Sequence, residues 1–351
     1  MAARRARLRD IAEALDLSVN TVSRALAGKS DVSARTRELI RAEAERIGYV
    51  PNIGARSLVL GSTMTIGLVI TNPSNPFYAQ LISAIELSCR AAGYSLVLGI
   101  SAESPELEAG TVDTLLRSGV DGAIVVPVQA DAGVQAGNGP WQRLQSAGIP
   151  VVLVNRDLTG SGWDFVGTDN EIGAHGATLA ALRGGAHSIV LVEEDLPITT
   201  IQQRITGFQR ALTESGVGVT DDNVVTVPTR RSDDAALPWQ ADEGYRMAQR
   251  ILDERTVDAV VVGNDYFALG VYRAIAERGL RVPEDVAVVG FGDHPYAAYL
   301  DPALTTVRLP AAEVGRSAME RLLHRLGEDT EPVTRLLVPP TLVERSSTRP
   351  D

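Results

Sequence analysis

Seven short runs of apolar, mostly β-branched residues recur between residues 65 and 290 of this 351-residue chain. The runs are residues 66–70, 96–98, 123–126, 151–154, 189–192, 259–262 and 286–289. Continuous rather than alternating apolar runs predict strands that are buried on both faces. Helical patterns separate the runs, which predicts an α/β fold with doubly wound parallel sheets. About 280 residues are more than a domain built on a single sheet usually contains, so we expect two α/β lobes.

Residues 8–26 follow a different pattern, with two short helical segments separated by a break at residues 15–17. Apolar residues at helical spacing mark the first segment, at Leu8, Ile11 and Leu15. Ser18 is a good N-cap for the second segment, which carries Val22 and Leu26 inward. Its outer face carries small polar groups and one cation: Asn20, Thr21, Ser23 and Arg24. This pattern is typical of a helix-turn-helix that meets the DNA major groove, and the alternative is an ordinary helical hairpin.

A third helix is predicted from the N-cap Ser33 to Gly48, with an inner face of Leu39, Ile40, Ala44 and Ile47. The connector at residues 49–61 contains a proline near its start and ends in Gly-Ser, as a domain linker would. Residues 1–62 hold eleven Lys/Arg against seven Asp/Glu, whereas the remainder has a net charge of −15. A basic N-terminal region followed by an acidic remainder favours a protein that contacts phosphate groups through one face. The rest of its surface would be repelled by the phosphates.

Several protein classes are disfavoured by the sequence. Cys89 is the only cysteine, which excludes an intrachain disulfide and fits a reducing compartment. No apolar run approaches the length of a membrane span, and the N-terminus does not resemble a signal peptide. We therefore expect a cytoplasmic protein without membrane contact. No dinucleotide fingerprint, nucleophile elbow or metal-ligand spacing is present, so neither enzyme activity, a cofactor nor a metal is expected.

Polar and aromatic residues follow several of the predicted strands, at residues 72–78, 155–156, 264–265 and 291–293. In open parallel sheets, ligands bind beyond the carboxyl ends of the strands. The sequence therefore predicts a ligand site formed by these segments.

Motifs along nearly the whole chain resemble the lactose-repressor/galactose-repressor (LacI) family of bacterial transcription regulators. They lie at residues 9–12, 18–24, 32–37, 48–52, 55–58, 75–77, 119–122, 204–208, 264–270, 282–285, 290–291 and 302–306. The resemblance implies a helix-turn-helix domain at residues 1–50 and a hinge at residues 51–62. It also implies a two-lobed core at residues 63–346, similar to periplasmic sugar-binding proteins, with the chain crossing between the lobes. A homodimer on a near-palindromic operator is expected.

For DNA, the resemblance implies that Val19, Asn20 and Arg24 read base edges. Phosphate contacts are expected from Ser18, Thr21, Ser23, Ser33 and Thr36. Ser18 and Ser33 could instead serve only as helix caps, or do both. In the hinge, Leu58 matches the family's leucine that enters the minor groove, with Arg56 beside it. The alternative for Leu58 is a contact between domains.

For an effector, the resemblance implies stacking on Phe77 and Tyr78, with Arg204 reaching the ligand across the cleft. The alternative for Arg204 is a surface ion pair. Further candidates are Asn155, Arg156, Trp239, Asn264 and Asp265. Asn264 could instead cap the helix that follows it. Aromatic rings combined with charged and amide groups are the usual apparatus for a sugar.

The chain also departs from the family pattern. Many members have a carboxylate at the position of Gly292, and here Asp293 is the candidate substitute. Asp16 replaces the glycine of the helix turn, although Asp tolerates a left-handed conformation. The acidic stretch 193–195 replaces glycine-rich residues, and near a cleft it would disfavour an acidic or phosphorylated effector.

The sequence thus predicts a sequence-specific transcriptional repressor whose operator affinity is switched by a small molecule, expected to be a sugar. One alternative is a DNA-binding regulator whose effector is not a sugar, or is a protein, or is lacking. A solute-binding transport component and an enzyme are two further alternatives. The helix-turn-helix pattern disfavours the first of these, and the lack of a catalytic motif disfavours the second.

Overall fold

The computed structural model describes residues 6–26, 31–49, 62–128, 140–158, 160–228, 241–327 and 331–349. The chain divides into two compact units, residues 1–64 and residues 65–351. In the parts that are described, no helix is both long and apolar enough to cross a membrane.

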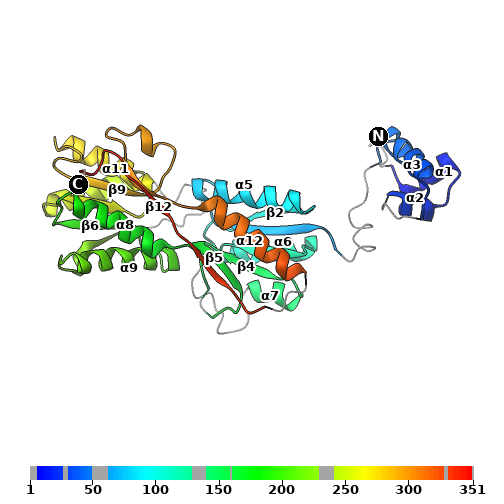
Figure 1. Cartoon of the computed structure of the whole chain (residues 1–351), viewed down its shortest axis with the longest axis horizontal. Coiled ribbons are helices and arrows are strands. Elements are labelled where there is room, and N and C mark those ends of the chain that lie inside the picture. The colour runs from blue at the N-terminus through cyan, green and yellow to red at the C-terminus, as the bar shows by residue number, and fades with distance from the viewer. Residues whose placement is uncertain are drawn as a thin grey trace. The chain divides into compact units, whose positions relative to one another are not determined.

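The described residues of the first unit form three helices, α1 (Leu8–Leu15), α2 (Val19–Leu26) and α3 (Ala34–Arg46) (Figure 1). Asp16 ends α1 in the left-handed conformation, with φ of 54°. Side chains from all three helices form a common core, in which Ile11, Val22 and Ile40 are fully buried. The predicted helix pair and third helix are therefore present.

The inner face of α3 differs from the prediction at one position. Leu39 is 53% exposed, whereas its neighbour Ile40 is fully buried. Successive helical residues are about 100° apart, so the face shared by Ile40, Ala44 and Ile47 excludes Leu39.

The first lobe of the second unit contains a six-stranded parallel sheet of order β11-β5-β4-β3-β1-β2. Its strands are β1 (Thr65–Ile70), β2 (Ser95–Ile100), β3 (Gly122–Val125), β4 (Val151–Val154), β5 (Asp164–Thr168) and β11 (Arg335–Val338). One face packs against α5 (Pro76–Ala91) and α12 (Ala311–Leu326), and Cys89 of α5 is buried there. The other face packs against α6 (Pro105–Ser118) and α7 (Pro140–Ser146).

The second lobe repeats this architecture with the order β12-β10-β9-β8-β6-β7. Its strands are β6 (Ile189–Glu194), β7 (Val224–Val227), β8 (Ala259–Val262), β9 (Ala287–Gly292), β10 (Thr305–Arg308) and β12 (Thr341–Val343), with only β12 antiparallel to its neighbour. The helices are α8 (Asn170–Arg183) and α9 (Thr199–Glu214) on one face, and α10 (Ala241–Glu254) and α11 (Asp265–Glu277) on the other. The described residues of this lobe also include two short 3-10 turns, η2 (Asp221–Asn223) and η3 (Ala297–Tyr299).

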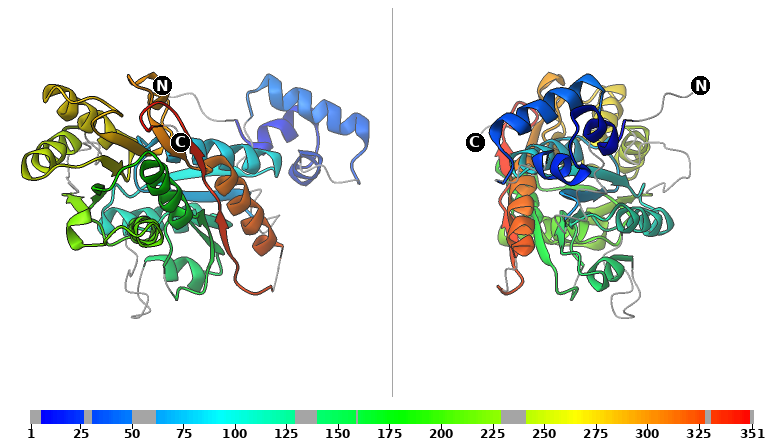
Figure 2. Two further views of the ribbon diagram at one scale, coloured as in Figure 1. Left: turned by 60° about the vertical axis from the view of Figure 1, so that its left-hand side comes forward. Right: turned by 90° about the vertical axis from the view of Figure 1, so that its right-hand side faces the viewer.

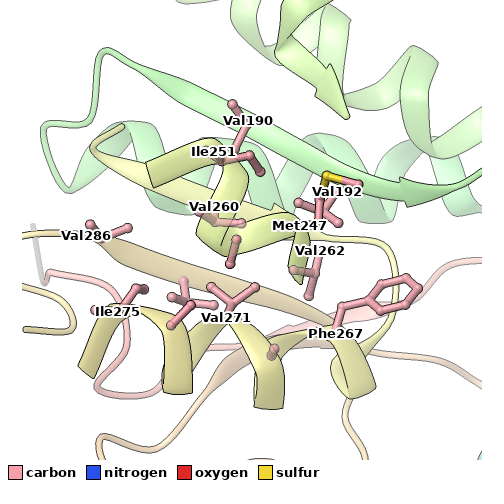
Figure 3. Close-up of a cluster of buried hydrophobic side chains, with 14 of the residues drawn as sticks. Val190, Val192, Met247, Ile251, Val260, Val262, Phe267, Val271, Ile275 and Val286 are labelled. Atoms are coloured by element: carbon pink, nitrogen blue, oxygen red, sulfur yellow. The ribbon is translucent and has the colours of Figure 1, made fainter. Parts of the chain in front are cut away.

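Side-chain alternation along β6 explains how both faces of the second sheet are covered. Val190 and Val192 lie in one cluster with Met247 of α10 and Val271 of α11 (Figure 3). The intervening Ile189 and Leu191 lie in the opposite cluster with α8 and α9. The apolar run is continuous because each face of the sheet takes every second residue.

One of the seven expected strands is not buried on both faces. Strand β2 lies at the edge of its sheet, and Leu98 and Ile100 are more than 40% exposed. An apolar run alone does not distinguish an edge strand from a central one.

The chain passes between the two lobes three times within the described residues. The passages follow β5, β10 and β11 and lead into α8, α12 and β12 respectively (Figure 2). The carboxyl ends of strands from both sheets therefore lie beside the crossing segments.

Candidate functional site

A cavity of about 60 Å³ lies where the two lobes meet. The first lobe contributes the segments after β1 and β4, and the second contributes α9 and the ends of β6, β8 and β9. The lining is Asn75, Phe77, Tyr78, Asn155, Arg156, Asn170, Glu194, Ile198, Thr200, Arg204, Gly263, Asn264, Phe291, Gly292, His294 and Leu309. Asn170 and Leu309 come from crossing segments, so the cavity uses both sheets and their connections.

Six of the residues that the sequence singled out for an effector lie in this lining: Phe77, Tyr78, Asn155, Arg156, Arg204 and Asn264. Asn264 also caps α11, because its side-chain oxygen accepts a hydrogen bond from the Tyr266 N–H at 3.0 Å. The two roles considered for Asn264 are therefore compatible. The predicted Trp239 lies outside the described residues.

The wall of the first lobe is held together by short polar contacts. Asn155 adopts a left-handed φ of 63°, and its amide donates to the Tyr78 hydroxyl at 3.2 Å. The ring of Tyr78 packs edge-on against Phe77, with centroids 5.4 Å apart. Burial raises the pKa of Tyr78, so its hydroxyl stays protonated and is available as a donor or acceptor.

Arg156 forms a buried ion pair with Glu103 behind the cavity. Its two terminal nitrogens donate to the two carboxylate oxygens at 2.7 and 2.6 Å, and both side chains are at most 5% exposed. Burial alone would lower the pKa of Arg156, but the Glu103 charge offsets this and the pKa is raised. Glu103 has a positive φ of 59°, a backbone conformation that costs free energy and that this pairing helps to hold.

Arg204 forms an equivalent pair on the second lobe. It donates to both oxygens of Glu193 at 2.6 and 2.9 Å, and its guanidinium lies 5.3 Å from the centre of the Phe291 ring. The Glu193 side chain is fully buried and that of Arg204 is 11% exposed. Arg204 thus forms an ion pair and also lines the cavity, but the pair is buried rather than on the surface.

Two carboxylates that the sequence placed against an effector lie elsewhere. Asp265 is fully buried beneath the lining, where it accepts hydrogen bonds from the Thr306 hydroxyl and the His294 N–H at 2.7 and 2.8 Å. Asp293 is paired with Arg308 and Arg345 at 2.7 and 2.6 Å, and it does not line the cavity. The charge of Asp293 is therefore already balanced by two arginines outside the cavity lining.

Several lining residues were not predicted from the sequence, notably Asn170, Thr200 and His294. Phe291 lies in the predicted segment 291–293, and Glu194 lies in the acidic stretch 193–195. Nothing in the sequence distinguishes His294 from the chain's other histidines.

Glu108, on α6, adds a pH-sensitive group behind the Arg156 pair. Its carboxylate accepts the Val128 N–H at 2.7 Å, and burial raises its pKa from 4.5 to about 7, opposed by Val128 and Arg156. The folded state therefore favours the protonated carboxyl. The stability that this group provides is complete below pH 4.5 and is lost as the pH rises through about 7.

We expect Glu108→Gln to remove this pH dependence, because the amide cannot ionise. At pH 8 the variant should exceed the native protein in free energy of unfolding by up to about 3 kcal/mol, and the difference should vanish near pH 4. Urea titrations at both pH values measure this difference. The exposed neighbour Glu106 is the control, and Glu106→Gln should leave the loss of stability between pH 5 and 8 in place.

The first unit presents a separate polar surface on α2. Val19, Asn20 and Arg24 are exposed, and Val19 is 43% exposed although it is apolar. Arg24 is paired with Asp31 at 2.5 Å, and both side chains are about half exposed. This surface can therefore offer an amide, a guanidinium and a methyl face to a base edge.

Ser18 and Ser33 are both helix caps. Their hydroxyl oxygens accept the N–H groups of Thr21 and Thr36 at 3.0 and 3.1 Å. Both serines are exposed, so capping leaves them accessible. Ser23 is partly exposed on α2, whereas Arg56 and Leu58 lie outside the described residues.

Across the described ranges, no group of three or more His, Cys, Asp or Glu side chains could hold a metal ion.

Each of the two units matches a known protein family. Residues 7–52 match the family described as bacterial regulatory proteins, lacI family, and residues 180–348 match the periplasmic binding protein-like domain. The ribose operon repressor of Escherichia coli (strain K12) is 30% identical over 343 residues, which cover 97% of this chain and 99% of that repressor.

Solved structures extend the comparison to the whole fold. The lac repressor dimer bound to operator and the anti-inducer ONPF superposes with a TM-score of 0.85 at 26% identity, over 98% of this chain and 99% of that one. A complex of the transcriptional regulator CelR with cellobiose has a TM-score of 0.71 at 28% identity, over 98% and 100% of the two chains. This chain therefore belongs to the lacI family of bacterial regulatory proteins and is an effector-regulated, DNA-binding transcriptional repressor, not an enzyme.

Proposed function

We propose that the effector of this repressor is a neutral sugar bound in the cavity between the lobes. The proposal rests on one observation. Arg156 and Arg204, which line the cavity beside aromatic rings and amides, are both paired with buried carboxylates. Phe77 and Tyr78 supply an apolar surface for a sugar ring, while Asn155 and Asn264 supply hydrogen bonds for hydroxyl groups. The likeness to a cellobiose-bound regulator supports the same class of ligand.

The charge balance of the cavity favours a ligand without negative charge. Arg156 and Arg204 are the cations, and Glu103, Glu193 and Glu194 outnumber them. A phosphate would have to displace a carboxylate from a buried pair, which costs several kcal/mol of desolvation and lost pairing.

Calorimetry tests this proposal directly. We expect a neutral sugar such as D-ribose or cellobiose to bind, and D-ribose 5-phosphate to bind at least about tenfold more weakly than D-ribose. Tighter binding of the phosphate than of the neutral sugar would contradict the proposal.

For the DNA, we propose that α2 reads bases through Val19, Asn20 and Arg24, with phosphate contacts from Ser18, Thr21, Ser23, Ser33 and Thr36. These residues are exposed or partly exposed on α2 and at the N-termini of α2 and α3, which supports these roles. Arg56 and Leu58 would act in a hinge at residues 51–62, between a DNA-binding domain at 1–50 and a core at 63–346. Two copies of the chain would bind a near-palindromic operator in the cytoplasm, where the DNA is.

Arg24→Ala is expected to weaken operator binding by about 1–3 kcal/mol and to relax the preference at one base position. The exposed pair with Asp31 opposes this contact by no more than about 1 kcal/mol. Asp31→Asn is the matched variant, and it should tighten operator binding slightly because Arg24 is released. Fluorescence anisotropy on operators with single base substitutions measures both effects. A uniform loss over all sequences in Arg24→Ala would instead assign Arg24 to a phosphate.

A further inference from the structure

His294 occupies the space that a carboxylate at position 292 would need. A Cβ atom on Gly292 would lie 2.8 Å from the Cε1 atom and 3.0 Å from the Nδ1 atom of the imidazole. Gly292 also has a φ of 141°, a backbone conformation that residues other than glycine rarely adopt. A side chain at position 292 would therefore clash with the His294 ring unless that ring moved.

The His294 imidazole is buried in the lining of the cavity, against two tyrosine rings. His294 is 3% exposed and lines the cavity, and its Nε2 atom has no hydrogen-bond partner among the described residues. Its ring packs against Tyr266 and Tyr296 at centroid distances of 5.1 and 5.7 Å. The backbone N–H of His294 donates to the Asp265 carboxylate at 2.8 Å. A buried polar atom without a partner is costly, so its presence at a cavity points to a ligand that satisfies it.

We propose that His294 hydrogen bonds to the effector, through Nε2 and to a single hydroxyl of a neutral sugar. This role rests on the proposed sugar site. An imidazole offers one hydrogen bond at Nε2, whereas a carboxylate at position 292 could accept two from neighbouring hydroxyls. His294 therefore selects sugars by one hydroxyl instead of a vicinal pair.

The imidazole carries no charge in the physiological range. Burial lowers the pKa of His294 to about 4, although the nearby Asp293 charge opposes this shift. A neutral imidazole cannot compensate an anionic group, in agreement with a neutral ligand.

A pair of near-isosteric variants separates the hydrogen bond from packing. His294→Leu keeps apolar contact with the two tyrosines but removes Nε2, and His294→Gln keeps a polar group at a similar reach. Calorimetry with D-ribose, D-glucose and cellobiose should show at least about tenfold weaker binding of the preferred sugar to His294→Leu. For His294→Gln we expect a loss of less than about threefold. The exposed His187 is the control, and His187→Leu should bind as the native protein does.

The outcomes distinguish a failure of the role of His294 from a failure of the proposed sugar site. Equal sugar binding by the native protein and His294→Leu, or equal losses in the Leu and Gln variants, would overturn the role of His294 and leave the sugar site intact. Failure of the native protein to bind any of the three sugars would overturn the sugar site and the role of His294 together. Thermal unfolding by circular dichroism confirms that each variant is folded before binding is measured.

Discussion

Arg204→Met is expected to lower the free energy of unfolding of the core by about 3–5 kcal/mol and to abolish effector binding. The reason is the environment of Glu193, whose side chain is fully buried and accepts two hydrogen bonds from Arg204. After the substitution, the Glu194 N–H at 3.0 Å still donates to that carboxylate, but the cation is gone. A methionine can fill the space over Phe291, but it cannot neutralise the charge. Urea titration of the full chain measures the loss.

A double substitution tests this explanation. Arg204→Met combined with Glu193→Gln should recover much of the stability, because no buried charge is left, whereas sugar binding should stay lost. The exposed pair of Arg250 and Glu254 is the control, and Arg250→Met should change the free energy of unfolding by about 1 kcal/mol or less. Equal effects of Arg204→Met and Arg250→Met would show that burial of the pair has no energetic importance.

Ile40→Ala is expected to unfold the first unit and so to remove operator binding. Ile40 is fully buried in the only core shared by α1, α2 and α3 among the described residues. Truncating a buried isoleucine costs about 2–5 kcal/mol, and a core of this size supplies little more than that in total. Limited proteolysis of the full chain measures the open population of residues 1–64, and fluorescence anisotropy measures operator affinity.

The neighbouring residue provides a matched control for this prediction. Leu39→Ala removes an apolar side chain of similar size that is 53% exposed, so its effect on protease resistance should be below about 0.5 kcal/mol. If Leu39→Ala and Ile40→Ala were cleaved alike, the orientation of α3 described above would be wrong.

Much of the fold was predictable because long apolar runs and helix caps are local signals. The runs that became β1, β3, β4, β6, β8 and β9 are continuous because both faces of these strands are covered. Five strands had no such run. Asp164 and Gly167 interrupt β5, Thr305 and Thr306 open β10, and β7, β11 and β12 lie at sheet edges. These strands are fixed by their neighbours in space, which a local pattern does not contain.

The candidate site was predictable to a similar degree and for a similar reason. Residues directly after the strands, such as Tyr78, Asn155 and Asn264, follow from the rule that ligands bind at strand carboxyl ends. Whether a carboxylate faces the cavity depends on distant partners, and Arg308 and Arg345 turn Asp293 away from it. His294 was missed because its role depends on the glycine two residues before it and on the packing of its ring.

We propose that a sugar in the cavity changes the affinity of the first unit for its operator. A ligand can shift this equilibrium only by its differential affinity for the two states. The most direct measurement is a titration of operator DNA by fluorescence anisotropy with and without saturating sugar, using the sugar that calorimetry shows to bind. We predict a change of about 5- to 150-fold in operator affinity, and no change in Arg204→Met–Glu193→Gln. A sugar that binds by calorimetry and leaves operator affinity unaltered would contradict the claim.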